Sequence, residues 1–322
     1  MKRSTFMKAL ALPLGLSLVG RQAMAQSFPA KPVRLVVPFP PGTATDSAAR
    51  LLGQQLSVSL GQPFVVDNKP GAGGSIGAME VVRAAPDGYT LLFGSNSALS
   101  SNVALLKTMP YDPTKDFTPV AGFGETMHVL MVKSGFPAKT LPEFVAYVKQ
   151  RPGKVSAGYG SSTAQVGIAM LNKLAGLDLL AVPYKGIPLA VNDVLGGTLD
   201  ITSVDLGNAM AQAKGGNLRA LAVTSARRNP LAPEWPAVAE TLPGFDLTSW
   251  FGIVGPAGIP RDVVDKLHAA ITQALKQPEV KANLATLGTT PMPLAPEQLK
   301  AFIVTEIAKW IRLARDANLQ PE

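Results

Sequence analysis

The 322-residue chain contains no cysteine and only two histidines, His128 and His268. The absence of cysteine excludes disulfide bonds, thiolate nucleophiles and thiolate metal ligands. The two histidines do not stand at ligand spacing from each other, so we expect no metal site. Without covalent or metal cross-links, the fold must be held together by core burial, which a chain of this length allows.

Charged residues are also scarce, at 16% of the chain, although the formal net charge is +8. The Lys and Arg residues are scattered and form no basic run with interleaved aromatic residues, which argues against a nucleic-acid partner. Hydrophobic residues make up 47% of the chain. This composition is typical of a packed globular protein and not of a disordered one.

A long apolar run is present only near the amino end, at residues 9–19. It is shorter than the roughly 20 residues that a membrane-spanning helix needs. Lys2 and Arg3 precede this run, and Ala23-Met24-Ala25 follows it as a small-x-small cleavage site. We therefore expect a signal peptide over residues 1–25, cleavage after Ala25 and a periplasmic protein. An uncleaved membrane anchor is the alternative.

Short β-branched runs alternate with helical patterns in the remaining chain, which is typical of parallel sheets covered by helices. Residues 117–132 contain two apolar runs, and Gly122 and Gly124 between them predict a turn that interrupts the segment. The predicted strands are 33–37, 64–66, 89–93, 180–182, 199–204, 219–224 and 247–254, and the predicted helices are 45–59, a helix ending at 84, 140–149, 164–175, 189–195, 260–276, 279–287 and 296–318.

The glycine-rich segment at residues 70–77 resembles a dinucleotide-binding loop but lacks its pattern. The third glycine of G-x-G-x-x-G falls on Ile76, and Asp87 lies in a turn and not at a strand end. The sequence also contains no P-loop. We therefore expect no nucleotide and no other cofactor.

The parts of a hydrolytic site are missing from the sequence. No G-x-S-x-G elbow is present, and no histidine lies near Ser161-Ser162-Thr163 in the chain. A serine without a base is a poor nucleophile. Asp193, Asp200 and Asp205 are candidates for acid–base work, but turn or surface roles explain them as simply. We predict no catalytic residue.

Two loops combine hydroxyl groups with predicted helix starts. The first runs from Phe39 to Asp46 and contains Gly42 and Thr43, and the second contains Ser161, Ser162 and Thr163. Free backbone N–H groups at helix N-termini bind carboxylates and phosphates without help from Arg or Lys. Both loops therefore predict an anion site, although plain helix caps explain the same residues.

An ordered set of motifs resembles one known family. The set comprises residues 36–42 (VVPFPPG) with Asp46, 68–74 (NKPGAGG), 87–91 (DGYTL), 182–186 (VPYKG), 221–224 (LAVT) and 255–258 (GPAG). Together they span the chain beyond the predicted signal peptide. The sequence resembles the Bug proteins, the extracytoplasmic receptors of tripartite tricarboxylate transporters.

This resemblance implies an α/β, two-lobed periplasmic-binding-protein fold of the type II kind, with a mostly parallel sheet in each lobe and two hinge crossings, near 122–130 and 248–253. Lobe 1 would comprise residues 26–125 and 250–322, and lobe 2 residues 126–249. The implied function is capture of a small carboxylate in the cleft between the lobes, by a monomer that serves membrane transporter subunits. A ligand sensor for a membrane receptor and a periplasmic enzyme are the alternatives.

We predict that the ligand contacts the loops facing this cleft. Gly42 and Thr43 would hold one carboxylate from lobe 1, and Ser162 and Thr163 from lobe 2. The full predicted set is Phe39, Gly42, Thr43, Asp46, Asn96, Ser97, Ser161, Ser162, Thr163, Ala164, Tyr184, Lys185, Gly186 and Asp205.

The sequence departs from the family pattern at two places. Thr43 replaces a usual second glycine, and Ala169 stands near the place of a usual histidine. Gln165 would offer an amide that the usual pattern lacks.

Overall fold

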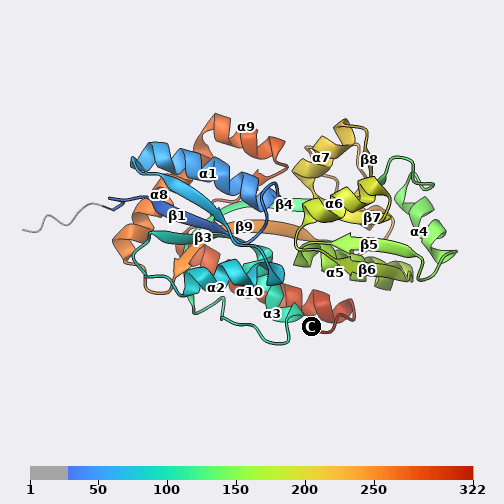
Figure 1. Cartoon of the computed structure of the whole chain (residues 1–322), viewed down its shortest axis with the longest axis horizontal. Helices are drawn as coiled ribbons and strands as arrows, with labels where there is room; N and C mark the ends of the chain where they lie inside the picture. Colours follow the sequence, from blue (N-terminus) through green and yellow to red (C-terminus); the bar gives the residue numbers. More distant parts are fainter. Residues whose placement is uncertain (1–27, 322) are drawn as a thin grey trace, which may run out of the picture.

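The computed structural model describes residues 28–321 of the chain, so the predicted signal peptide lies outside the described residues. The described residues form mixed β-sheets with helices on both faces (Figure 1). The strands are β1 (Val33–Val37), β2 (Phe64–Asn68), β3 (Thr90–Ser95), β4 (Phe117–Lys133), β5 (Val155–Tyr159), β6 (Leu179–Pro183), β7 (Ile201–Asp205), β8 (Leu218–Val223), β9 (Thr248–Pro256) and β10 (Thr290–Pro291).

The main helices fall close to the predicted ranges, and a short 3-10 turn (Ala72–Gly74) and a π-helical turn η2 (Ser97–Ser101) lie between them. The α-helices are α1 (Ala44–Leu60), α2 (Ser75–Val82), α3 (Asn102–Leu105), α4 (Leu141–Lys149), α5 (Ser162–Ala175), α6 (Ile187–Gly196), α7 (Leu206–Lys214), α8 (Arg261–Lys276), α9 (Pro278–Thr286) and α10 (Pro296–Asp316).

Each half of the molecule has a core of three parallel strands. In the first sheet, β1 lies between β2 and β3, and β9 then pairs antiparallel with β3. In the second sheet, β5 lies between β6 and β7. We call the first sheet with its helices the first lobe, and the second sheet with α4 to α7 the second lobe.

Strand β4 joins the two sheets, and here the prediction of two interrupted runs was wrong. Residues 117–127 pair with β9 in the first sheet, and residues 128–133 pair with β7 and β8 in the second. Gly122 and Gly124 lie inside this strand. A Cβ on Gly122 would come 2.6 Å from the carbonyl oxygen of Met292. These glycines therefore admit a chain segment that packs closely on the strand, and they do not mark a turn.

Four elements were missed in the sequence because their signals are weak. Strand β5 reads VSAGY, with small residues that a pleated sheet does not favour. Helix α7 follows β7 without a loop, and the side chain of Asp205 caps its first turn. The turn η2 and helix α3 together contain only nine residues, too few to show a helical period.

Helix α10 contacts both lobes. Leu299 and Ile303, in its first half, pack against Trp250 of β9, whereas Trp310 and Ala314 lie in the core cluster of the second lobe. The buried carboxylate of Glu306 accepts hydrogen bonds from both indole N–H groups, at 2.9 Å from Trp250 and 3.0 Å from Trp310. Trp310 is thus a core residue, and α10 connects the two lobes.

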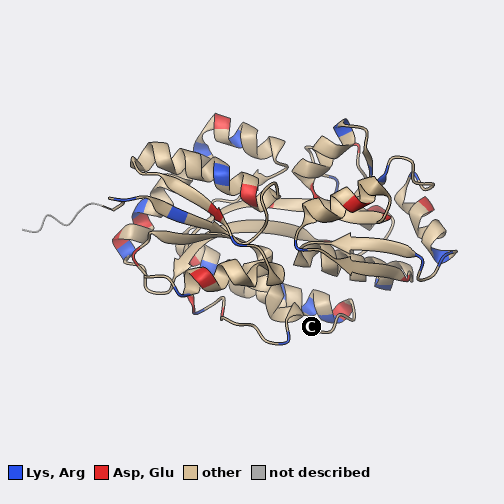
Figure 2. Cartoon of the chain, viewed as in Figure 1, with Lys and Arg blue, Asp and Glu red and all other residues tan. Residues whose placement is uncertain are grey.

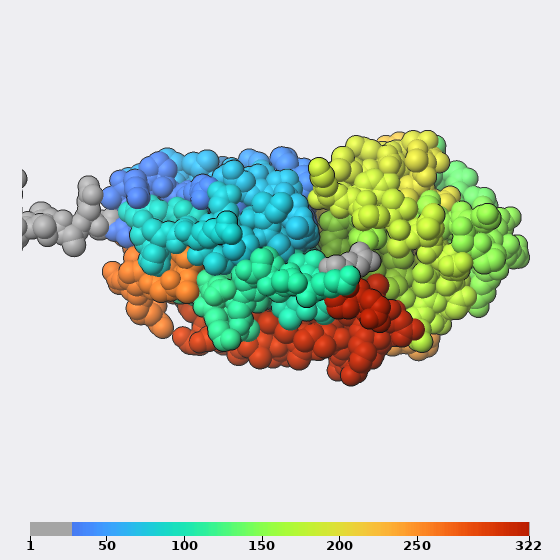
Figure 3. All heavy atoms as spheres, turned by 60° about the horizontal axis from the view of Figure 1, so that its bottom comes forward, coloured from blue at the N-terminus to red at the C-terminus, as the bar shows by residue number. Residues whose placement is uncertain are grey.

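Charged residues are spread along the outer helices and loops (Figure 2). Among the described residues, no helix combines the length and the apolar composition that crossing a membrane would require. The two lobes meet along a boundary where residues of the first lobe face those of α6 and α7 (Figure 3).

Candidate functional site

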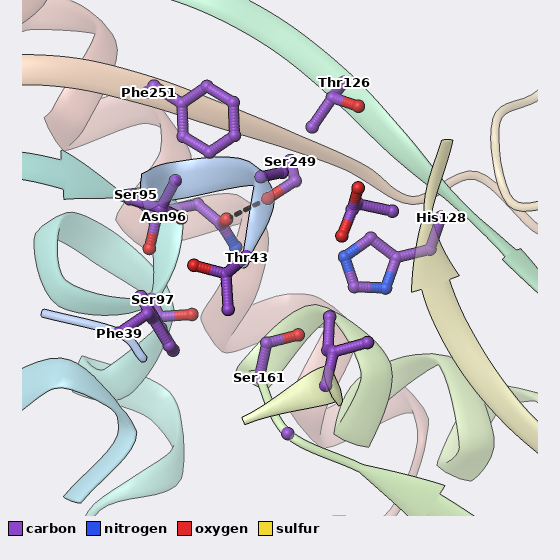
Figure 4. Close-up of a pocket in the computed structure, with 15 residues that line it drawn as sticks. Phe39, Thr43, Ser95, Asn96, Ser97, Thr126, His128, Ser161, Ser249 and Phe251 are labelled. Atoms are coloured by element: carbon purple, nitrogen blue, oxygen red, sulfur yellow. Dashed lines mark hydrogen bonds between the residues drawn. The ribbon is translucent and has the colours of Figure 1, made fainter. Parts of the chain in front are cut away.

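A small cavity, which we call the inner cavity, lies between the lobes beside the ends of β3 and β7, the start of β9 and the middle of β4 (Figure 4). Its volume is about 30 Å³. Its lining comes from both lobes and is mostly hydroxyl, amide and aromatic: Phe39, Thr43, Ala44, Thr45, Ser95, Asn96, Ser97, Thr126, His128, Gly160, Ser161, Ile187, Asp205, Ser249 and Phe251.

The N-termini of four helices border this cavity. Thr43 caps α1 by accepting a hydrogen bond from the Asp46 N–H at 3.3 Å, and Ser161 caps α5 by accepting from the Ala164 N–H at 3.3 Å. Asp205 caps α7, and Ile187 is the first residue of α6. Because the first N–H groups of a helix carry partial positive charge, the cavity is suited to an anion.

Asp46 does not line the cavity but holds the α1 loop in place. Its carboxylate accepts hydrogen bonds from the Gly42 N–H at 3.0 Å and the Asn68 amide at 2.9 Å, and it forms an ion pair with Arg50. Burial raises the pKa of Asp46, but these bonds to Arg50, Asn68 and Gly42 outweigh burial and lower it. The Gly42 N–H is therefore already donated within the loop.

The hydroxyls of Ser162 and Thr163 bond to the first lobe instead of pointing into the inner cavity. The Asn96 amide donates to Thr163 Oγ1 at 3.0 Å. Ser162 Oγ lies 2.7 Å from Ser97 Oγ and 2.5 Å from Ser101 Oγ. These contacts form a polar seam between η2 and α5. The ligand contacts predicted for Ser162 and Thr163 stay predictions. A ligand could bond to these hydroxyls only by replacing or sharing their hydrogen bonds to Asn96, Ser97 and Ser101.

Asp205 also connects the lobes. Its carboxylate accepts hydrogen bonds from the N–H and the side-chain amide of Asn208, at 3.2 and 2.9 Å, and from the backbone N–H of Ala44 at the start of α1. The same Asn208 amide lies 3.2 Å from the carbonyl oxygen of Gly42. Burial raises the pKa of Asp205, and the bonds only partly offset that effect.

The strands contribute five lining residues that the predicted set did not contain: Ser95, Thr126, His128, Ser249 and Phe251. The sequence held a signal for Thr126, His128, Ser249 and Phe251, because they lie within the predicted hinge crossings at 122–130 and 248–253. Strands that cross between the lobes must border the cleft. The Ser249 hydroxyl donates to the side-chain oxygen Oδ1 of Asn96 at 2.5 Å (Figure 4).

His128 and Ser95 have unusual surroundings in this cavity. His128 Nδ1 lies 3.1 Å from Ser203 Oγ, and burial lowers the pKa of His128 to about 4. The imidazole is therefore neutral at pH 7. Ser95 Oγ is buried and has no hydrogen-bond partner within residues 28–321. Buried hydroxyls are nearly always satisfied, so Ser95 is a candidate contact for a bound polar group.

A second cavity, which we call the outer cavity, adjoins the first through Phe39, Gly160 and Ser161. Its volume is about 420 Å³. Three residues of the predicted set lie here and not in the inner cavity. The lining is Phe39, Gly71, Ala72, Gly73, Asn102, Leu105, Leu106, Tyr159, Gly160, Ser161, Ser162, Gln165, Pro183, Tyr184 and Lys185.

The remaining predicted residues have packing roles. Ala164 is buried in the first turn of α5. Gly186 precedes α6, and a Cβ there would come 2.8 Å from the Pro40 ring of the first lobe. Together, the structure places six predicted residues around the inner cavity and Ser162, Tyr184 and Lys185 around the outer one, while Gly42, Asp46, Thr163, Ala164 and Gly186 line neither.

No group of three or more potential metal ligands gathers within the part of the chain that the structure describes.

Comparisons with known proteins agree on one family. Residues 48–319 match the tripartite tricarboxylate transporter family receptor. Protein BugT of Bordetella pertussis is 36% identical over 298 residues, which cover 91% of each chain. Among solved structures, Rhodopseudomonas palustris Rpa4515 with adipate superposes with a TM-score of 0.89 at 32% identity, covering 92% of this chain and 100% of that one.

A second solved structure, MatC from Rhodopseudomonas palustris with bound malate, has a TM-score of 0.84 at 35% identity and covers 89% of this chain and 99% of that one. These neighbours have the two-lobed fold of periplasmic binding proteins, so the fold implied by the motifs is confirmed. The chain belongs to the family of tripartite tricarboxylate transporter receptors.

Proposed function

We propose that this chain is a periplasmic receptor that captures a small carboxylate between its lobes and presents it to the membrane subunits of a tripartite transporter. The observation that carries the proposal is the inner cavity, where helix N-termini from both lobes surround the unpartnered hydroxyl of Ser95. The adipate and malate complexes of the two related structures support a carboxylate as the ligand class.

The carboxylate would lie against the starts of α1 and α5, with Ser95 and Ser161 as hydroxyl contacts. No Lys or Arg lines the inner cavity, so the negative charge would be met by helix N-termini. Asp205 is the acidic residue in this lining. Burial raises the pKa of Asp205, although hydrogen bonds from Asn208 and Ala44 lower it in part.

We assign the chain no catalytic step. The imidazole in the cavity, His128, bonds to Ser203, which does not line the cavity.

A thermal-shift screen tests this function. The chain from Gln26 onward would be heated with a panel of small carboxylates and with their neutral amides. A ligand at 100 times its dissociation constant stabilises the folded state by about 2.7 kcal/mol, which raises the melting temperature by several degrees. A shift with an acid but not with its amide supports the proposal, and no shift with any acid contradicts it.

Ser95→Ala sharpens the test. Its hydroxyl bonds no described residue, so removal should leave the melting temperature of the ligand-free protein nearly unchanged. Affinity for the acid should fall about fivefold to tenfold, the effect of one lost hydrogen bond. Unchanged affinity would remove Ser95 from the binding site.

A further inference from the structure

Helix α10 crosses between the lobes on the face of strand β9 that points away from the inner cavity (Figure 1). Side chains alternate between the two faces of a strand, so neighbouring residues of β9 have different partners. Ser249 and Phe251 line the inner cavity, whereas Trp250 between them packs edge-to-face on Phe302 of α10, with ring centroids 5.0 Å apart. Strand β9 therefore borders the inner cavity with one face and contacts α10 with the other.

One carboxylate oxygen connects this strand to the second lobe. Oε2 of Glu306 accepts a hydrogen bond from the indole N–H of Trp250, on β9, and another from the indole N–H of Trp310. Trp310 is fully buried in the core cluster of the second lobe. Glu306 itself is 5% exposed, and its other oxygen, Oε1, accepts from Lys309 Nζ at 3.1 Å. Both carboxylate oxygens therefore have partners, and the shared oxygen links the two indoles.

The lobes touch in this structure, for example where the side-chain amide of Asn208 donates to the carbonyl oxygen of Gly42 at 3.2 Å. If the lobes separate, Trp250 moves with the first sheet and Trp310 with the core of the second lobe. At least one indole bond to Glu306 must then lengthen or break, unless Trp310 leaves its core. The two bonds to Glu306 therefore favour the arrangement in which the lobes touch.

We propose that Glu306 is a positioning residue, which makes α10 a strap across the hinge and holds the lobes in contact before any ligand binds. The physical reason is the cost of an unpaired donor. Two buried indole N–H groups without an acceptor are unfavourable, and separation of the lobes would let water reach them. The inference goes beyond the proposed function, because it concerns the equilibrium between touching and separated lobes in the ligand-free protein.

The distance between two spin labels, one on each lobe, tests the proposal by double electron–electron resonance. The chain contains no cysteine, so Gln54→Cys on α1 and Lys214→Cys on α7 can be labelled without background. Both residues are exposed, and neither lines the inner or the outer cavity. The doubly labelled, ligand-free chain from Gln26 onward is the parent of all variants. We expect one main distance in this parent, because the lobes are held in contact.

Three variants change the acceptor and one donor of the strap. Glu306→Leu removes both carboxylate oxygens and should add a population in which the labels lie more than about 2 Å further apart, the size of a domain rearrangement. Glu306→Gln keeps one oxygen that can accept from both indoles, so it should keep the parent distance. Trp250→Phe removes the N–H group on β9 and keeps an aromatic ring, so it should show the longer distance even if Glu306→Leu does not fold.

Val148→Ala is the control for a general loss of stability. Val148 is fully buried in α4, away from α10 (Figure 1), so this variant should unfold at a lower temperature and keep the parent distance. The parent distance in both Glu306→Leu and Trp250→Phe would overturn the proposal. So would a longer distance in Val148→Ala, or one in Glu306→Gln equal to that in Glu306→Leu. Because no ligand is added, none of these results bears on carboxylate capture, which the thermal-shift screen tests separately.

Discussion

His128→Gln should make the protein markedly less sensitive to mild acid. In the folded protein, burial lowers the pKa of His128 to about 4, whereas an unfolded chain has the ordinary value of about 6.5. Above pH 6.5 the imidazole is neutral in both states and has no effect on pH dependence. As the pH falls below 6.5, the unfolded state takes up a proton that the folded state cannot accept, so the unfolded state is favoured.

The size of the effect follows from the two pKa values. Each unit of difference corresponds to about 1.4 kcal/mol, so His128 costs the folded state about 2 kcal/mol at pH 5 and about 3 kcal/mol at pH 4. At pH 5 this is a drop in melting temperature of roughly 4–8 °C for a protein of this size. The loss of folding free energy levels off below about pH 4, because His128 then takes up a proton in the folded state as well.

Urea denaturation at pH 7 and pH 5 measures this directly. His128→Gln lowers stability at pH 7 through imperfect packing, so the quantity to compare is the change between the two pH values. That change should be about 2 kcal/mol smaller in His128→Gln than in the wild-type protein. An identical pH dependence in His128→Gln and in the wild-type protein would refute the buried, neutral state of His128.

Two further changes test the contact between the lobes and the α1 cap. A Cβ on Gly207 of α7 would come 2.5 Å from the backbone of Leu287 in the first lobe, so Gly207→Ala should hold the lobes apart, raise the radius of gyration in small-angle scattering and weaken ligand binding. Gly196→Ala is the control: a Cβ there has no neighbour nearer than 4.0 Å, so this variant should change neither the radius of gyration nor the affinity. An unchanged radius of gyration in Gly207→Ala would count against this contact. The Thr43 hydroxyl donates to the Pro40 carbonyl oxygen at 2.9 Å and caps α1, so Thr43→Val should lower the free energy of unfolding by about 1 kcal/mol while Thr43→Ser keeps most of it. Equal stability of the two variants in thermal unfolding would show that the cap bond contributes nothing.

The local elements of this protein were largely determined by the sequence itself. The sequence predicted a helix over 140–149, and in the structure the Thr140 side chain caps the start of α4. The loops after β1 and β5 were predicted to begin helices, and they do so at Thr43 and Ser161. Caps, turns and helical periods depend on residues within a few positions of each other, so the sequence alone carries them.

The ordered motifs also predicted the two-lobed fold, which the related structures confirm. The predicted lobe boundaries stay a proposal. The structure adds that α10 packs on both lobes through Trp310 and Leu299, a contact between distant segments that no local pattern shows.

Only the tertiary structure decided which polar groups are free. Asp46, Ser162 and Thr163 carry the right chemistry for a ligand, but Asn68, Ser97 and Asn96, each far away in the sequence, already bond them. Ser95 and Lys185, by contrast, have no such partner among the described residues. Whether a polar side chain is satisfied depends on neighbours that the fold brings together from distant positions. The sequence could therefore name the chemistry of the cleft, and the three-dimensional arrangement was needed to identify the groups still available to a ligand.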